Sequence, residues 1–152
     1  MKPDRGSGSP LREVIGVIET EGDCAEWTFP ADPTAVRTAR AVVRKQLVRW
    51  GLGTLGDVTV LLVSELVTNS LRYASGPIGV RLVRPAEAPG VLRVEVSDPL
   101  PDPPLARHAT LDDEGGRGLQ LVACSATRWG TRQGHSGKTV WFELTLPVPG
   151  RG

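Results

Sequence analysis

Two segments of this 152-residue chain alternate apolar and polar residues so regularly that they constrain the fold more than any other feature. In "CAEWTF", residues 24–29, every second side chain is apolar, and "VLRVEVSD", residues 91–98, shows the same alternation. Successive side chains of a β-strand point to opposite faces of the sheet. Each segment is therefore predicted to be a strand that buries one face and exposes the other.

Two long segments with helical periodicity lie between these strands. In residues 30–53, Asp32 is placed to cap a helix, Pro33 suits its first turn, and Gly51 marks its end. A second helix is predicted from about Leu55 or Asp57 to Ala74. The apolar residues expected to pack are Val36, Ala39, Val43, Leu47 and Trp50 in the first helix, and Val58, Leu61, Leu62, Leu66 and Leu71 in the second.

The rest of the chain completes the order of elements. "GGRGLQLVACSA" predicts a third helix, and "LREVIGVIET" is apolar enough for an extra strand, whose place stays open. Further strands are predicted around residues 78–84, 127–132 and 139–146. This order implies one mostly antiparallel sheet with helices packed on one face, which is an α+β two-layer sandwich.

Composition limits the classes of function. Hydrophobic residues make up 39% of the chain and charged residues 23%, as in a soluble globular protein. We expect one domain over residues 11–147, with disordered tails at 1–10 and 148–152. The net charge of +1 and the scattered arginines predict no nucleic acid or membrane surface as partner. No apolar run suggests a membrane span or signal peptide, so a cytoplasmic location is expected, with Cys24 and Cys124 as packing thiols.

Polar residues interrupt the second helix in "SELVTNSLRYA", residues 64–74. Glu65, Asn69 and Tyr73 recur at i, i+4 and i+8 and therefore share one face. An amide oxygen such as that of Asn69 can bind Mg²⁺, and Glu65 could orient or deprotonate an attacking hydroxyl. Arg72 could reach phosphate oxygens. From these residues alone, a surface ion pair of Glu65 and a simple hydrogen bond of Asn69 stay open.

Two further features suggest a ligand pocket. Asp98 has the parity of the apolar residues of its strand, so its carboxylate is predicted to point beneath the helices, where it needs a donor. That donor is either the following loop or a ligand group such as an adenine amine. The glycine-led start of the third helix would present free N–H groups to an anion. Between them, the proline-rich segment 99–114 is predicted to be an irregular, functional loop.

Taken together, "ELVTNSLRYA", "VSD", "EGGRGLQLV" and "GKTVWFEL" resemble the N-box, the two glycine boxes and the closing strand of the GHKL ATP-binding family. That family includes histidine kinases, gyrase, Hsp90-type chaperones and MutL. The resemblance covers roughly residues 25–147. Among the members, the chain is most similar to stand-alone anti-sigma-factor serine/threonine kinases of the RsbW/SpoIIAB type, which include many small actinobacterial regulators.

This resemblance implies a Bergerat-type fold, ATP and Mg²⁺ as cofactors, and phosphoryl transfer to a hydroxyl of an antagonist protein. A sigma factor as second partner and a homodimer are also implied. Asn69 would be the magnesium ligand, Glu65 the general base, and Asp98 the adenine-recognising residue. The other implied nucleotide contacts are Arg72, Tyr73, Gly115, Gly116, Arg117, Gly118, Leu119 and Thr139, with residues 99–114 as the ATP lid.

The chain departs from the family pattern in two places. After Asp98 it reads "DPLPDP" where the family has Asp-x-Gly-x-Gly, which favours the alternative of a binding regulator with little or no kinase activity. The family has Gly-Thr where this chain has "GKT", which leaves the register open between Lys138 and Thr139, and parity places Thr139 on the opposite face from Val140. A histidine kinase is not expected, because His108 and His135 lie in a proline-rich loop and a glycine turn.

Overall fold

The computed structural model describes residues 16–21, 23–73, 76–99, 116–134 and 137–146. The strands and helices that the sequence predicted are all found, and part of the N-terminal apolar segment forms a strand as well. The expected tails at 1–10 and 148–152 lie outside the described residues. In chain order the elements are β1 (Gly16–Glu21), β2 (Cys24–Phe29), α2 (Thr34–Arg49), η1 (Gly53–Leu55), α3 (Gly56–Tyr73), β3 (Ile78–Val83), β4 (Val91–Asp98), α4 (Gly116–Ser125), β5 (Arg128–Gly134) and β6 (Gly137–Thr145).

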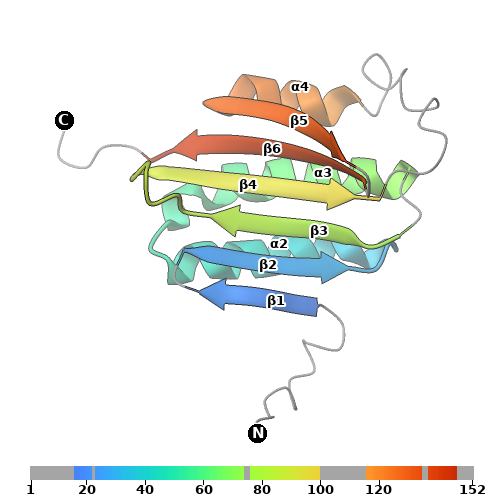
Figure 1. Cartoon of the computed structure of the whole chain (residues 1–152), viewed down its shortest axis with the longest axis horizontal. Helices are drawn as coiled ribbons and strands as arrows, with labels where there is room; N and C mark the ends of the chain where they lie inside the picture. Colours follow the sequence, from blue (N-terminus) through green and yellow to red (C-terminus); the bar gives the residue numbers. More distant parts are fainter. Residues whose placement is uncertain (1–15, 22, 74–75, 100–115, 135–136, 147–152) are drawn as a thin grey trace, which may run out of the picture.

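The strands of the described residues form one six-stranded sheet in the order β1-β2-β3-β4-β6-β5. Every neighbouring pair is antiparallel. The helices α2 and α3 run side by side across one face of this sheet, behind it in Figure 1. The α+β two-layer prediction is therefore confirmed, and the N-terminal strand β1 takes one edge of the sheet.

The core lies between the helices and the sheet face that alternation predicted to be buried. In β4 the side chains of Leu92 and Val94 are fully buried, whereas the neighbours of opposite parity are partly exposed. Phe29 from β2 and Phe142 from β6 are the largest completely buried side chains. From the helices, Ala39, Val43, Leu47, Leu62, Val63, Leu66 and Val67 close this core.

The ends of α2 follow from local chemistry. At its start, the Thr34 backbone N–H donates to Asp32 Oδ1 at 2.9 Å, so Asp32 satisfies a donor of the first turn. At its end, Gly51 has φ +75°, its N–H bonds the Val48 carbonyl, and the Leu52 N–H bonds the Leu47 carbonyl. This pair of bonds is a Schellman motif, in which the left-handed residue is preferably glycine.

Two expectations about burial were wrong. Leu61 is 46% exposed, because it lies one turn after the exposed Asp57 on the outward side of α3. Cys124 is exposed near the end of α4, whereas Cys24 is half-buried, and both thiols are free. Among the described residues, no helix is both long and apolar enough to cross a membrane.

The sheet face opposite α2 and α3 carries charged side chains in place of apolar ones. Glu143 accepts from Arg93 Nη1 at 3.0 Å and lies 3.5 Å from Arg128 Nη1. Arg93 also stacks 4.5 Å above the ring of Trp141. A second carboxylate, that of Glu95, lies within 3.3–3.6 Å of guanidinium nitrogens of Arg81, Arg93 and Arg132.

Replacing Gly51 with alanine should destabilise the fold by about 1 kcal/mol, because a Cβ is strained at a positive φ. Gly53→Ala is the matched control: neither position has an atom within 4 Å of an added Cβ, but only Gly51 has a positive φ. The control should be neutral or stabilising by a few tenths of a kcal/mol. Urea unfolding of both variants measures the difference, and equal stability would contradict the assigned helix end.

Candidate functional site

The helix α3 places Glu65 and Asn69 one turn apart, on the side that faces α4. Both side chains are half-buried, and the Glu65–Leu66 backbone lies against Gly118, where an added Cβ would be 3.5 Å from the Glu65 carbonyl oxygen. The glycine-led start of α4 therefore packs directly on the turn of α3 that carries Glu65. The structure brings together two motifs that are about fifty residues apart in the sequence.

The side-chain oxygen of Asn69 is buried and accepts no hydrogen bond within the part of the chain that the structure describes. A buried carbonyl oxygen without a donor costs free energy, so such an atom in a native site calls for an explanation. An amide oxygen is also a ligand type that Mg²⁺ accepts. This orphaned atom fits the metal-ligand role that the sequence resemblance implies for Asn69.

Asp98 ends β4 on the buried face of the sheet, as its parity predicted, and is only 5% exposed. Ser70 Oγ on α3 donates a hydrogen bond to Asp98 Oδ2 at 2.9 Å. Because Ser70 follows Asn69 directly, one turn of α3 holds both the orphaned amide oxygen and the donor to the buried carboxylate. The sequence contained a signal for Ser70, since it is a polar residue at a core position, four residues after Leu66 and three after Val67.

The first residues of β6 lie next to Asp98 on the neighbouring strand. Asp98 pairs with Lys138 in the antiparallel register, so these two residues share the helix-covered face of the sheet. Gly137 fits so tightly here that an added Cβ would overlap the Asp98 carbonyl oxygen. The sequence left the register open between Lys138 and Thr139, and the pairing of β4 with β6 places Lys138 beside Asp98.

Thr139 is not brought to this cluster. It pairs with Ser97, and the two hydroxyl oxygens are 2.8 Å apart on the sheet face opposite Asp98. The strand alternation that separates Thr139 from Val140 also removes it from the side on which Glu65, Asn69 and Asp98 lie. The implied nucleotide contact through Thr139 therefore disagrees with the geometry of β6.

The other predicted contacts are placed only in part. Arg72 is exposed in the last turn of α3, and Gly116 begins α4. Leu119 is half-buried and packs against the core. The side chains of Tyr73 and Arg117 lie outside the described residues, as do Gly115, His108, His135 and the predicted lid from residue 100 onward.

Comparison with known proteins agrees with this arrangement. The family model of the histidine kinase-like ATPase domain matches residues 29–144, which is most of the chain and includes every described element from α2 to β6 except the last residue of β6. A search of curated proteins gave no match. The chain belongs to the histidine kinase-like ATPase domain family.

Proposed function

We propose that this protein is an ATP-binding regulator of the anti-sigma-factor serine/threonine kinase type, acting in the cytoplasm. It would transfer the γ-phosphoryl group of ATP to a hydroxyl of an antagonist protein, with a sigma factor as its other partner. The observation that carries the proposal is the buried Asn69 oxygen one turn after Glu65, which has no hydrogen-bond partner among the residues that the structure describes. Family membership supports ATP binding, and the resemblance of the motifs supports the kinase type.

At one end of the site, Asp98 would accept a hydrogen bond from the adenine amino group. Its carboxylate is suited to this because burial excludes water and Ser70 fixes one of its two oxygens. A carboxylate held in this way favours a nucleobase with an amino group at this position over one with a carbonyl oxygen there. With the carbonyl oxygen, two hydrogen-bond acceptors would face each other without a donor. We therefore assign adenine selectivity to Asp98 and its orientation to Ser70.

At the other end, Asn69 Oδ1 would be one ligand of the Mg²⁺ ion that accompanies the phosphates. Bound Mg²⁺-ATP supplies a phosphoryl group whose developing charge the ion neutralises. Glu65, one turn earlier, would hold the hydroxyl of the antagonist and accept its proton. The first N–H groups of α4, beginning at Gly116, would bind phosphate oxygens, as helix N-termini do, with Arg72 as a further cation.

One observation favours a second candidate, a regulator that binds nucleotide without transferring phosphate. Asp98 is followed by Pro99, and the Pro99 ring lies so close to Gly76 that an added Cβ there would be 3.0 Å from Pro99 Cγ. Pro99 therefore fixes the backbone φ directly after the adenine site, at the x position of Asp-x-Gly-x-Gly, and Leu100 stands where the family has its first glycine. The two candidates differ in whether Glu65 acts as a base.

The Glu65→Gln variant separates these candidates. Removing the base should lower transfer of labelled γ-phosphate to a purified antagonist protein by about 10²–10⁴-fold, whereas ATP binding should change little. Asp57→Asn is the control, because Asp57 is an exposed acid on the same helix and should leave transfer unchanged. Equal transfer by wild type and Glu65→Gln would refute the role of the base. Absence of transfer by wild-type protein that binds ATP would favour the second candidate.

The Asn69→Ala variant tests the metal ligand. It should weaken ATP binding at least about tenfold in the presence of Mg²⁺ and leave binding in EDTA unchanged, because only the metal-dependent part is lost. Its melting temperature should equal or exceed that of the wild type, since the Asn69 oxygen has no hydrogen bond to lose in the described structure. Titration calorimetry with and without Mg²⁺ measures the effect. An equal loss in EDTA would contradict direct ligation.

The Ser70→Ala variant tests the orientation of the adenine-binding carboxylate. It should weaken ATP binding roughly tenfold and reduce the preference for ATP over GTP, because the buried Asp98 carboxylate loses a charge-assisted hydrogen bond. Ser70→Thr keeps the hydroxyl and should retain the preference. If Ser70→Ala lowers only the melting temperature and leaves the ATP/GTP ratio unchanged, the serine has a purely structural role.

A further inference from the structure

The outward side of the helical layer concentrates positive charge. The helix α2 carries five basic side chains and no acidic one, although the whole chain has a net charge of only +1. Arg37, Arg40 and Arg44 recur at i, i+3 and i+7, so they share one side of the helix over about 10 Å. All three are exposed.

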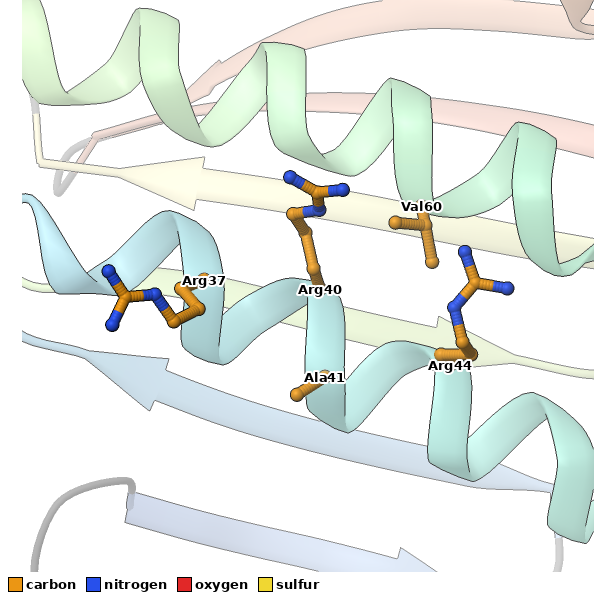
Figure 2. Close-up of a pocket in the computed structure, with 5 residues that line it drawn as sticks. All are labelled: Arg37, Arg40, Ala41, Arg44 and Val60. Carbon is orange, nitrogen blue, oxygen red and sulfur yellow. The ribbon is translucent and has the colours of Figure 1, made fainter.

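These arginines line a hollow between α2 and α3. The hollow measures about 260 Å³, and its other lining residues are Ala41 from α2 and Val60 from α3. Figure 2 shows Arg40 and Arg44 extending from α2 toward α3 on either side of Val60. The lining of the hollow therefore combines three guanidinium groups, which we call its rim, with the short side chain of Ala41 and the buried Val60.

The fold does not neutralise this rim. Across the described residues, no ion pair involves Arg37 or Arg40, while Arg44 Nη1 lies 3.1 Å from Asp57 Oδ1. The Asp57 side chain is 97% exposed, so water and salt screen that pair. Like charges at i, i+3 and i+4 disfavour a helix. The repulsion among these three arginines, which have no acidic neighbour on α2, thus opposes the folding of the helix. Their presence on one side of α2 therefore needs an explanation other than stability.

Each of the two helices carries an exposed aliphatic side chain close in sequence to the residues of the hollow. Val48 is 65% exposed one turn after Arg44, and Leu61 is 46% exposed one turn after Asp57. Arginines beside exposed aliphatic side chains are typical of a protein-binding surface, in which arginine is enriched next to apolar groups. A nucleic-acid surface would instead extend its charge to bind many phosphates.

We propose that the surface formed by Arg37, Arg40, Ala41, Arg44 and Val60 docks an acidic helical segment of a partner protein. Carboxylates spaced i, i+3 and i+7 on that segment would meet the three arginines, and its apolar side chains would cover Val48 and Leu61. The fork of donors on each guanidinium favours bidentate pairing with carboxylates. This surface lies on α2 and the adjoining side of α3, whereas Glu65 and Asn69 face α4, so the proposal goes beyond the nucleotide site.

The test uses a fluorescein-labelled synthetic helical peptide with glutamates at i, i+3 and i+7 and leucines beside them. Fluorescence anisotropy should show binding to the full chain, and NMR titration should shift amide signals of residues 37–48 and 57–61. The Arg37→Glu/Arg40→Glu variant should bind this peptide at least about tenfold more weakly and should instead bind the same peptide with lysines in place of glutamates.

Lys45→Glu/Arg49→Glu is the matched control, because both residues lie on α2 on the flank turned away from Arg40. It carries the same charge change and should retain peptide binding within about threefold. Circular dichroism and ATP binding verify that each variant is folded. The proposal is overturned if the glutamate peptide does not bind at about millimolar concentration, if a glutamine version binds equally well, or if the control loses as much affinity. Binding of duplex DNA in place of the peptide would also overturn it.

Discussion

A carboxylate buried at the end of a sheet must be hydrogen-bonded from inside the protein, and this requirement ties the sheet of this protein to α3. Asp98 sits on the apolar face of β4, and Ser70 donates to it across the layer boundary. The bond fixes which side of α3 faces the sheet, and helical geometry then turns Glu65 and Asn69 toward α4. The orientation of α3 about its own axis therefore sets both ends of the proposed site, the adenine end at Asp98 and the phosphate end at Asn69.

Local patterns in the sequence predicted the elements of this fold well. Strand alternation and helical periodicity depend on which face of an element is buried, and both are visible within ten to twenty residues. The cap at Asp32 and the left-handed Gly51 are likewise local, so both ends of α2 were predicted. The position of β1 at the sheet edge and the exposure of Leu61 were not, because each depends on which distant element packs alongside.

The same distinction separates the site residues that were predicted from those that were missed or left open. Asp98 could be placed from its own strand, because parity alone sets the face to which it points. Ser70 and Lys138 become part of the site only through a contact with Asp98 and through the pairing of β4 with β6. Thr139 shows how strict strand register is, since a shift of one residue moves a side chain to the opposite face of the sheet.

The charged face of the sheet has an unequal tolerance to mutation. Glu95 and Glu143 are each shared among several arginines, so loss of any one arginine leaves the carboxylate with another partner. Loss of either glutamate would instead leave two or three guanidinium groups facing one another across neighbouring strands. Substitution of a single arginine on this face is therefore tolerated more readily than substitution of either of the two glutamates that the arginines share.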